Sequence, residues 1–240
     1  AGAFSGCNQA QYINCEYTDL AYESGVTPDL EERQEVINEA FEVYSQDVPT
    51  IPVTDKPAPG LVRSDQLNLN RLGDGGFTVA NPLPYIYSTP KNGDGYVSSR
   101  QEALFETRNF LVIQNGFSSV IWNHLMSSTL VEYDENFELQ NMLADSIEYE
   151  NNNTRVIVEL KDATFHNGDP ITAEDVKWTY DFRWDNVGVF PQTEQVPRQG
   201  DSGINIVDDR TIEFNFTEQF AALTTRIWPA LSILHKQSWV

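Results

Sequence analysis

Residues 161–182 constrain the fold of this chain more than any other segment, because their order of residue types predicts a strand end, a tight turn and a capped helix. The turn is predicted over residues 167–170, where a glycine supplies a positive φ and a proline fixes φ. Thr172 can accept a hydrogen bond from a free helical amide, and Asp175, three residues later, completes the pattern of a capping box. Apolar residues then recur at helical spacing, which predicts a helix over residues 172–184.

The charge of the chain excludes some classes of partner. Its 240 residues include 36 acidic and 15 basic ones, which gives a net charge of −21. This charge opposes binding to nucleic acid or to anionic lipid, because the electrostatic interaction would be repulsive. Only five of the basic residues are lysine, and many carboxylates with few lysines are typical of a halophilic surface screened by salt. An ordinary acidic surface is the alternative.

Other helices and strands are predicted from caps and apolar periodicity. Thr27 and the acidic residues after it predict a helix over residues 27–46, whereas residues 1–25 are expected to be polar and turn-rich. Alternating apolar residues predict a strand over residues 156–160 and a hairpin over residues 204–216. The remaining predicted elements are strands at 76–80, 85–88 and 108–114 and helices at 120–130 and 221–230.

The least regular part of the chain is residues 54–104, which prolines and glycine clusters interrupt. We therefore predict three regions: 1–55, an irregular connector at 56–104, and 105–240 with a compact subdomain at about 131–233. The mixture of strands and helices predicts an α/β, or mixed α+β, fold. No apolar run reaches the 18 residues that a transmembrane helix requires.

Two cysteines and two sequons offer possible modifications. Cys7 and Cys15 could form a short disulfide loop in a secreted chain, or remain free thiols in a cytosolic one. Residues 3–7 faintly resemble a lipobox, in which Cys7 would carry a lipid, although no basic and apolar run precedes them. Asn152 and Asn215 begin glycosylation sequons that would be used only in an exported chain.

The segment containing Phe165-His166-Asn167-Gly168 and Thr172-Ala173-Glu174-Asp175-Val176 resembles the family-5 extracellular solute-binding proteins, the peptide and nickel receptors of ABC importers. Further similarities are Arg108–Gln114, Leu143-Ala144-Asp145-Ser146 and Asp208-Asp209-Arg210-Thr211-Ile212. Residues 107–240 are thus similar to the amino-terminal portion of that family. The acidic composition suggests a haloarchaeal member.

Residues 6–53 are similar to the carboxy-terminal portion of the same family, through Asn8, Tyr12 and Asn14, Pro28–Arg33 and Asp47–Pro52. The two blocks therefore occur in reversed order, and the central part of the family is missing. A circular permutation with a deletion, a junction between tandem copies and a piece of a longer chain would each explain this order. The resemblance implies periplasmic-binding-protein-like lobes, type II-like and incomplete.

The resemblance also implies a function and a site. The expected protein is the extracellular binding component of an ABC importer, membrane-anchored in its full-length form, which holds a peptide or similar small solute between two lobes that close about a hinge. The expected partners are the solute, an ABC permease and a further segment or chain that supplies the second lobe. The expected ligand-contacting residues are Asn115, Gly116, Phe117, Ser118, Ser119, Trp122, Tyr12 and Asn14. Each of them also has a plain structural interpretation as a turn, cap or core residue.

Two other classes of function are the alternatives to a binding protein. A surface scaffold or filament subunit that reuses the lobe fold is the alternative that the missing lobe favours. An enzyme is not expected, because the adjacent acidic pairs cannot face each other across a cleft and no G-x-S-x-G, P-loop or H-E-x-x-H motif is present. Two cysteines and three scattered histidines show no metal-ligand spacing, so neither a metal site nor a cofactor is expected.

Overall fold

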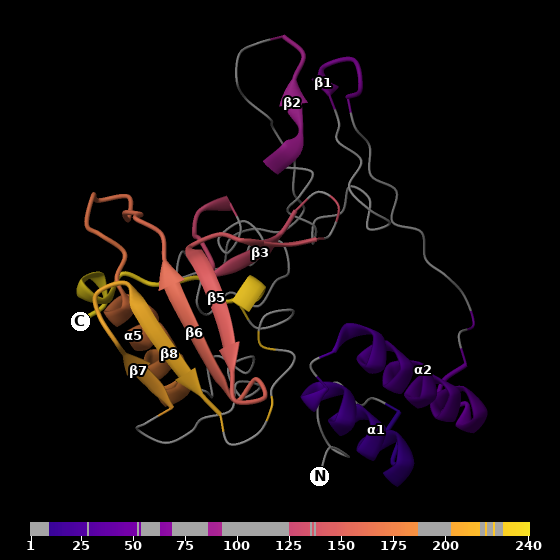
Figure 1. The fold of residues 1–240 in the computed structure, drawn as a ribbon. Helices are drawn as coiled ribbons and strands as arrows, with labels where there is room; N and C mark the ends of the chain where they lie inside the picture. Colours follow the sequence, from indigo (N-terminus) through magenta and orange to yellow (C-terminus); the bar gives the residue numbers. More distant parts are fainter. Residues whose placement is uncertain are drawn as a thin grey trace.

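Two groups of elements make up the described part of the chain in this computed structural model: a pair of helices near the N-terminus and a mixed sheet-and-helix unit toward the C-terminus (Figure 1). The structure describes residues 10–27, 29–51, 53, 63–68, 86–92, 125–134, 136, 138–186, 203–216, 219, 223 and 228–240.

A four-stranded antiparallel sheet forms the centre of the C-terminal unit, with the strand order β5-β6-β8-β7. Its strands are β5 (Ala144–Glu150), β6 (Arg155–Leu160), β7 (Ile204–Ile206) and β8 (Thr211–Asn215). The strand predicted at 156–160 and the hairpin at 204–216 are confirmed, because apolar alternation places every second side chain on the buried face. β5 was not predicted, because acidic residues interrupt the alternation of apolar residues in its sequence.

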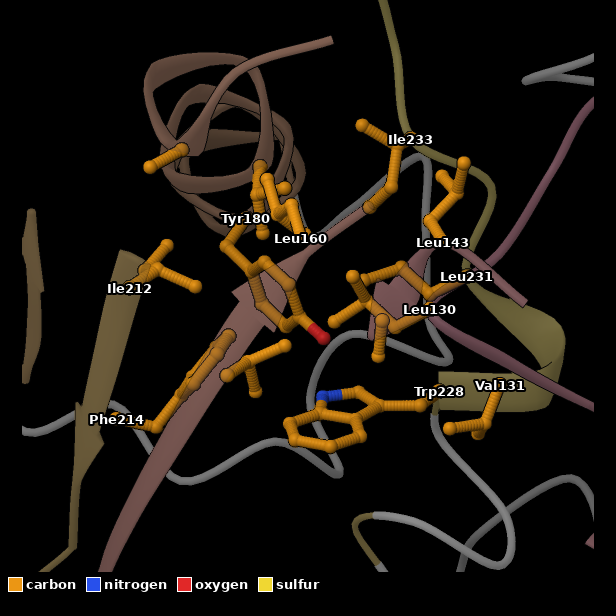
Figure 2. Close-up of a cluster of buried hydrophobic side chains, with 14 of the residues drawn as sticks. Leu130, Val131, Leu143, Leu160, Tyr180, Ile212, Phe214, Trp228, Leu231 and Ile233 are labelled. Atoms are coloured by element: carbon orange, nitrogen blue, oxygen red, sulfur yellow. The ribbon is translucent and has the colours of Figure 1, made fainter. Parts of the chain in front are cut away.

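One face of the sheet is covered by α5 (Ala173–Asp185), which buries Val176, Thr179 and Tyr180 (Figure 1). The predicted helix over 172–184 is therefore confirmed, with Thr172 as its N-cap. Figure 2 shows Tyr180 reaching from the helix into the core toward Trp228 and Phe214. The ring centroids of Tyr180 and Phe214 are 5.3 Å apart, as are those of Phe214 and Trp228. Aromatic contacts of this kind add to the stabilisation that burial of the rings provides.

The last residues of the chain close this core. Trp228 begins the short helix η5 (Trp228–Ala230), and η6 (Lys236–Ser238) lies close to the end of the chain. Between them, the amide of Ile233 donates to the carbonyl of Ser128 (3.0 Å), and the amide of Leu234 donates to Oγ1 of Thr179 in α5 (2.9 Å). The buried core consequently extends from Leu130 to Ile233.

Two short strand pairs complete the described elements. The two short antiparallel pairs are β1 (Leu67–Asn68) with β2 (Thr89–Pro90) and β3 (Val131–Tyr133) with β4 (Leu139–Asn141). Within the described residues, no helix is long and apolar enough to cross a membrane.

The N-terminal group contains α1 (Cys15–Val26) and α2 (Leu30–Asp47), which pack against each other. The prediction that residues 1–25 lack a helix was wrong for α1, whose weakly amphipathic sequence gives no clear stripe. The start of the second helix was also misplaced. Asp29 is its N-cap and accepts from the amides of Glu31 and Glu32, while Thr27 ends α1 and donates to the carbonyl of Glu23.

Two other predicted elements differ from the structure. Ile86 and Tyr87 are helical, so the strand at 85–88 was wrong, and the nearby strand β2 begins at Thr89. The helix predicted over 120–130 does not reach its predicted end, because residues 126–130 are bends and irregular backbone before β3. The strands predicted at 76–80 and 108–114 lie outside the described residues, as does most of the helix predicted at 221–230.

Candidate functional site

The segment from Asn115 to Ser119 and Trp122, which carries most of the predicted ligand contacts, lies outside the described residues. The roles of Asn115, Gly116, Phe117, Ser118, Ser119 and Trp122 therefore remain predictions. Tyr12 and Asn14 are the two predicted site residues that the structure places.

Tyr12 and Asn14 meet at one carboxylate. The Tyr12 hydroxyl donates to Oδ2 of Asp47 (2.8 Å), and Nδ2 of Asn14 donates to the same oxygen (2.7 Å). Asn14 is also the N-cap of α1, since its Oδ1 accepts from the amide of Tyr17 at 3.0 Å. Because Asp47 is the last residue of α2, these bonds tie the start of one helix to the end of the other. We call Tyr12, Asn14 and Asp47 the helix joint.

Three tyrosines pack around the helix joint. The ring centroid of Tyr12 lies 5.4 Å from those of Tyr17 and Tyr44, and the last two are 5.8 Å apart. Rings this close contact each other directly, so the described side chains leave no space among them for a solute. Sequence reasoning did not identify Tyr17, Tyr44 or Asp47 as part of this cluster, because α1 was not predicted and Asp47 lies more than 30 positions from Tyr12 and Asn14.

Electrostatics favours a charged carboxylate in the joint. The hydrogen bond from Asn14, followed by that from Tyr12, holds the pKa of Asp47 below its usual range. Partial desolvation, followed by the hydrogen bond to Asp47, raises the pKa of Tyr12 to about 12. At neutral pH the joint therefore contains an anionic acceptor and a neutral phenol that donates to it.

The second candidate region is the turn and capped helix that the sequence singled out. Gly168 has φ of 92°, which favours glycine there, and its amide donates to the carbonyl of Phe165 at 2.9 Å. Asn167 accepts from the amide of Asp169 (3.1 Å) and donates to its carboxylate (2.6 Å). These local bonds complete the tight turn that the residue types predicted.

Asp175 is the centre of this region. Its Oδ2 accepts from the amide and the hydroxyl of Thr172, at 3.1 and 2.7 Å, and the amide of Asp175 donates to that hydroxyl at 3.4 Å. Its Oδ1 accepts from the amide of Lys236 at 3.0 Å. The side chain is thus nearly buried, with 7% of Asp175 exposed, and every bond it makes is to the protein itself.

Residues near the C-terminus pack against the same turn. His235 lies with Nε2 3.2 Å from a carboxylate oxygen of Asp169, and its ring is 4.7 Å from that of Phe165. Lys236 pairs with Glu174, at 2.5 Å between Nζ and Oε1. The most recognisable motif of the sequence therefore stabilises the fold, and its polar groups are used for internal contacts.

Two further features of the described residues concern metal binding and buried titratable groups. No group of three or more His, Cys, Asp or Glu side chains could hold a metal ion within them. Arg183 is buried beside Tyr180, and burial lowers its pKa to about 10. Burial also raises the pKa of the Tyr180 hydroxyl above its usual value.

The predicted modification sites are only partly placed. Cys15 is exposed and unbonded within the described part of the chain, and Cys7 lies outside it, so a disulfide between them remains a prediction. Asn152 is exposed in the turn after β5, and Asn215 is half-buried at the end of β8.

The similarity of the sequence to a known protein family lies in the sheet-and-helix unit. A sequence profile described as bacterial extracellular solute-binding proteins, family 5 middle, matches residues 138–239. These residues include β5, β6, α5, β7 and β8, together with the turn and the capped helix. A search of curated proteins gave no match.

Several solved structures are similar to the chain at low sequence identity. OppA of Listeria monocytogenes bound to peptide has a TM-score of 0.50 and 19% identity, over 57% of this chain and 30% of that one. AppA of Bacillus subtilis in complex with a nonapeptide has a TM-score of 0.46 and 23% identity, over 54% and 25%. NikZ of Campylobacter jejuni in complex with Ni(L-His) has a TM-score of 0.40 and 20% identity, over 48% and 22%.

The likeness to the Listeria protein confirms the predicted fold class, which is mixed α/β and periplasmic-binding-protein-like. The chain spans less than a third of the length of these three structures. The reversed order of the two blocks and a haloarchaeal source remain predictions.

Proposed function

We propose that this chain is the substrate-binding component of an ABC importer and holds a peptide or similar small solute between two lobes. The observation that carries the proposal is the position of the family-5 profile match, which falls on the unit with the binding-protein fold. Oligopeptide-binding and nickel-binding proteins among the structural neighbours support the same class of function.

The proposed ligand contacts come from two segments. Phe117 and Trp122 pack on the solute, while Gly116 allows close backbone approach and the amides near Ser118 and Ser119 bind a carboxylate at a helix start. Asn115 lies in the same segment, and Tyr12 and Asn14 contribute from the hinge side. The direct bonds of Tyr12 and Asn14 to Asp47 favour an indirect contribution, in which the joint positions the hinge.

The proposed partners follow from this function. The solute is delivered to an ABC permease at the outer face of the membrane, to which the full-length protein is anchored. A further segment or a second chain supplies the missing lobe, because the present chain matches less than a third of its structural neighbours. Closure of the two lobes is a hinge motion that bound solute stabilises.

Calorimetric titration tests the proposal. A mixed-sequence dipeptide, pentapeptide and nonapeptide are each titrated into the purified chain, and at least one is expected to bind with a dissociation constant between about 1 μM and 1 mM. Replacing Phe117 and Trp122 by alanine is expected to weaken binding about tenfold or more. Phe41→Ala is the matched control, since Phe41 is an exposed aromatic residue of α2 outside the proposed site.

A different result would favour a surface scaffold. If no peptide gives heat while circular dichroism shows a folded chain, and light scattering shows assembly with increasing concentration, the receptor proposal is wrong for this chain. The exposed apolar residues Leu30, Phe41 and Ile51 of the N-terminal group are the observation that favours such assembly.

A further inference from the structure

The turn that joins β5 to β6 presents three consecutive asparagines in an unusual backbone conformation. Asn151, Asn152 and Asn153 have φ of 51°, 56° and 58°, which is the left-handed region. Among residues with a Cβ, asparagine is one of the few that adopts this conformation readily. Asparagine therefore suits the backbone conformation of this turn, which lies beyond the end of the sheet.

The base of this turn is fixed, whereas its tip is open. Arg155 pairs with Glu150 across the base, and the carbonyl of Thr154 accepts from the amide of Phe216 at 2.7 Å. At the tip, Asn152 is exposed, and its side-chain amide makes no hydrogen bond to any residue that the structure describes. An incoming enzyme can thus reach the amide nitrogen without displacing a neighbouring side chain.

Asn152 also begins one of the two sequons of the chain, Asn152-Asn153-Thr154. Such a sequon is accepted where it lies on an exposed loop of an exported protein. The hydroxyl of Thr154 donates to the carbonyl of Asn151 at 2.7 Å, so only this bond within the turn must open to present the hydroxyl.

The second sequon begins at Asn215, and its environment is different. Asn215 ends the strand β8, and its amide donates to the carbonyl of Gly203 at 2.7 Å. Its side-chain Nδ2 donates to Oε1 of Glu213 at 2.6 Å, and Glu213 in turn pairs with Arg155. Modification of Asn215 therefore requires the strand end to separate and a charged network to break.

We propose that Asn152 is an N-glycosylation site of the folded chain and that Asn215 is not. The donor is an oligosaccharide linked to a polyprenyl diphosphate. Nδ2 of Asn152 forms a bond to the anomeric carbon as the bond from that carbon to the diphosphate oxygen breaks. The polyprenyl diphosphate leaves with the electron pair, and the amide nitrogen loses one proton to a base of the transferase.

The occurrence of this modification in the cell rests on the proposed function, because an export route is needed to meet the transferase. The test is therefore made with purified components. The folded chain of 240 residues is incubated with a single-subunit oligosaccharyltransferase and its polyprenyl-diphosphate oligosaccharide. A short acceptor peptide in the same tube reports that the enzyme is active. Intact mass and glycopeptide mapping measure the occupancy of each asparagine.

The expected result is one glycan per chain, with occupancy at Asn152 at least about tenfold above that at Asn215. Asn152→Gln and Thr154→Val should both abolish the transfer, whereas Asn215→Gln should leave it unchanged. Unfolding the chain in a denaturant that the transferase tolerates should raise the occupancy of Asn215, because its strand bonds are then lost.

Two outcomes would overturn the proposal. One is modification of Asn215 to an equal or greater extent than Asn152 in the folded chain. The other is an unmodified Asn152 in a reaction in which the acceptor peptide is glycosylated. Neither outcome bears on solute binding, since the calorimetric titration uses the unmodified chain.

Discussion

The sheet-and-helix unit and the N-terminal helix pair are stabilised in different ways. In the unit, Tyr180, Phe214 and Trp228 are almost fully buried in a continuous core (Figure 2). In the helix pair, Ala40 is the one buried residue of α1 and α2, and Leu30 and Phe41 are 67% and 66% exposed. The pair relies instead on the helix joint and on contacts among tyrosines.

This difference shows that apolar residues serve different purposes in the two regions. Apolar side chains of the unit fold inward and supply its stability, at about 1.5–3 kcal/mol for each large side chain that is fully buried. Apolar side chains of the helix pair remain available for contact with other surfaces. We therefore expect removal of an aromatic ring to destabilise the sheet-and-helix unit far more than the helix pair.

The largest expected effect is on the core of the unit. Phe214→Ala should lower the free energy of unfolding by about 3–5 kcal/mol, because it leaves a cavity between Tyr180 and Trp228. Phe41→Ala in α2 should change the same quantity by about 0.5 kcal/mol or less. Urea denaturation followed by tryptophan fluorescence measures both. Equal losses in the two variants would remove the distinction between the regions.

A smaller effect is expected at the capped helix. Asp175→Ala removes the capping-box acceptor and the acceptor for the amide of Lys236, which should cost about 2 kcal/mol. Asp181→Ala on the same helix is the control, since it removes only an exposed pair with Lys177 and should cost about 0.5 kcal/mol. Thermal and urea unfolding provide the measurement. An Asp175 variant as stable as the control would mean that the capping box and the bond from the amide of Lys236 contribute nothing to stability.

In the helix pair, the expected change is local. Asp47→Ala removes the acceptor shared by Tyr12 and Asn14, so the amides of α1 should exchange with solvent about threefold to tenfold faster. The amides of β6 and β8 should be unaffected. Hydrogen exchange read by mass spectrometry distinguishes the segments, and Glu39→Ala, an exposed acid on the same helix, is the control. Faster exchange throughout the sheet would show that the two regions unfold together.

The difference in exchange rate between the wild type and Asp47→Ala should depend on pH, and the direction of the pKa shift gives its sign. The pKa of Asp47 is lowered in the folded chain, so the joint is intact above the unfolded value of about 4 and is lost as the pH falls through the lower folded value. The exchange rates of the wild type and of Asp47→Ala should therefore converge in acid. A difference that persists unchanged into strong acid would contradict the role of the carboxylate.

The smallest expected effect is a spectroscopic one at high pH. Because the pKa of Tyr12 is raised to about 12, its contribution is complete below the unfolded value of about 10 and is lost as the pH rises through 12. The late part of the tyrosinate absorbance titration should lose the amplitude of one tyrosine in Tyr12→Phe, and that amplitude should shift to lower pH in Asp47→Ala. Glu39→Ala should leave the amplitude in place.

Local chemistry determined how much of the fold could be predicted. The strand around Val158 and the helix after Thr172 were predictable, because alternation, a glycine turn and a capping box are short-range signals. β5 and α1 were missed because acidic residues interrupt their apolar patterns. The end of the helix near Leu130 was misplaced because Leu130 packs into a core made by distant segments. The residue types around it are compatible with a helix as well as with irregular backbone.

The candidate site was less predictable for a different reason. Tyr12 and Asn14 were identified through a family resemblance, yet the residue that joins them, Asp47, is more than 30 positions away. The contacts of Asp175 with Lys236 span 61 positions, and nothing in the spacing indicates them. Such pairings depend on tertiary arrangement, which short motifs do not encode.

The dependence of Asp175 on Lys236 has a consequence for synthesis on the ribosome. A nascent chain that has emerged only as far as α5 already contains the turn, the cap and the helix, but it lacks Trp228 and the residues that seal them. The aromatic side of α5 then faces water until some 50 further residues have been translated, which takes several seconds at about 5–20 residues per second. During that interval the incomplete core is exposed to chaperones, and it can close only after the residues from Trp228 to Lys236 have left the ribosome.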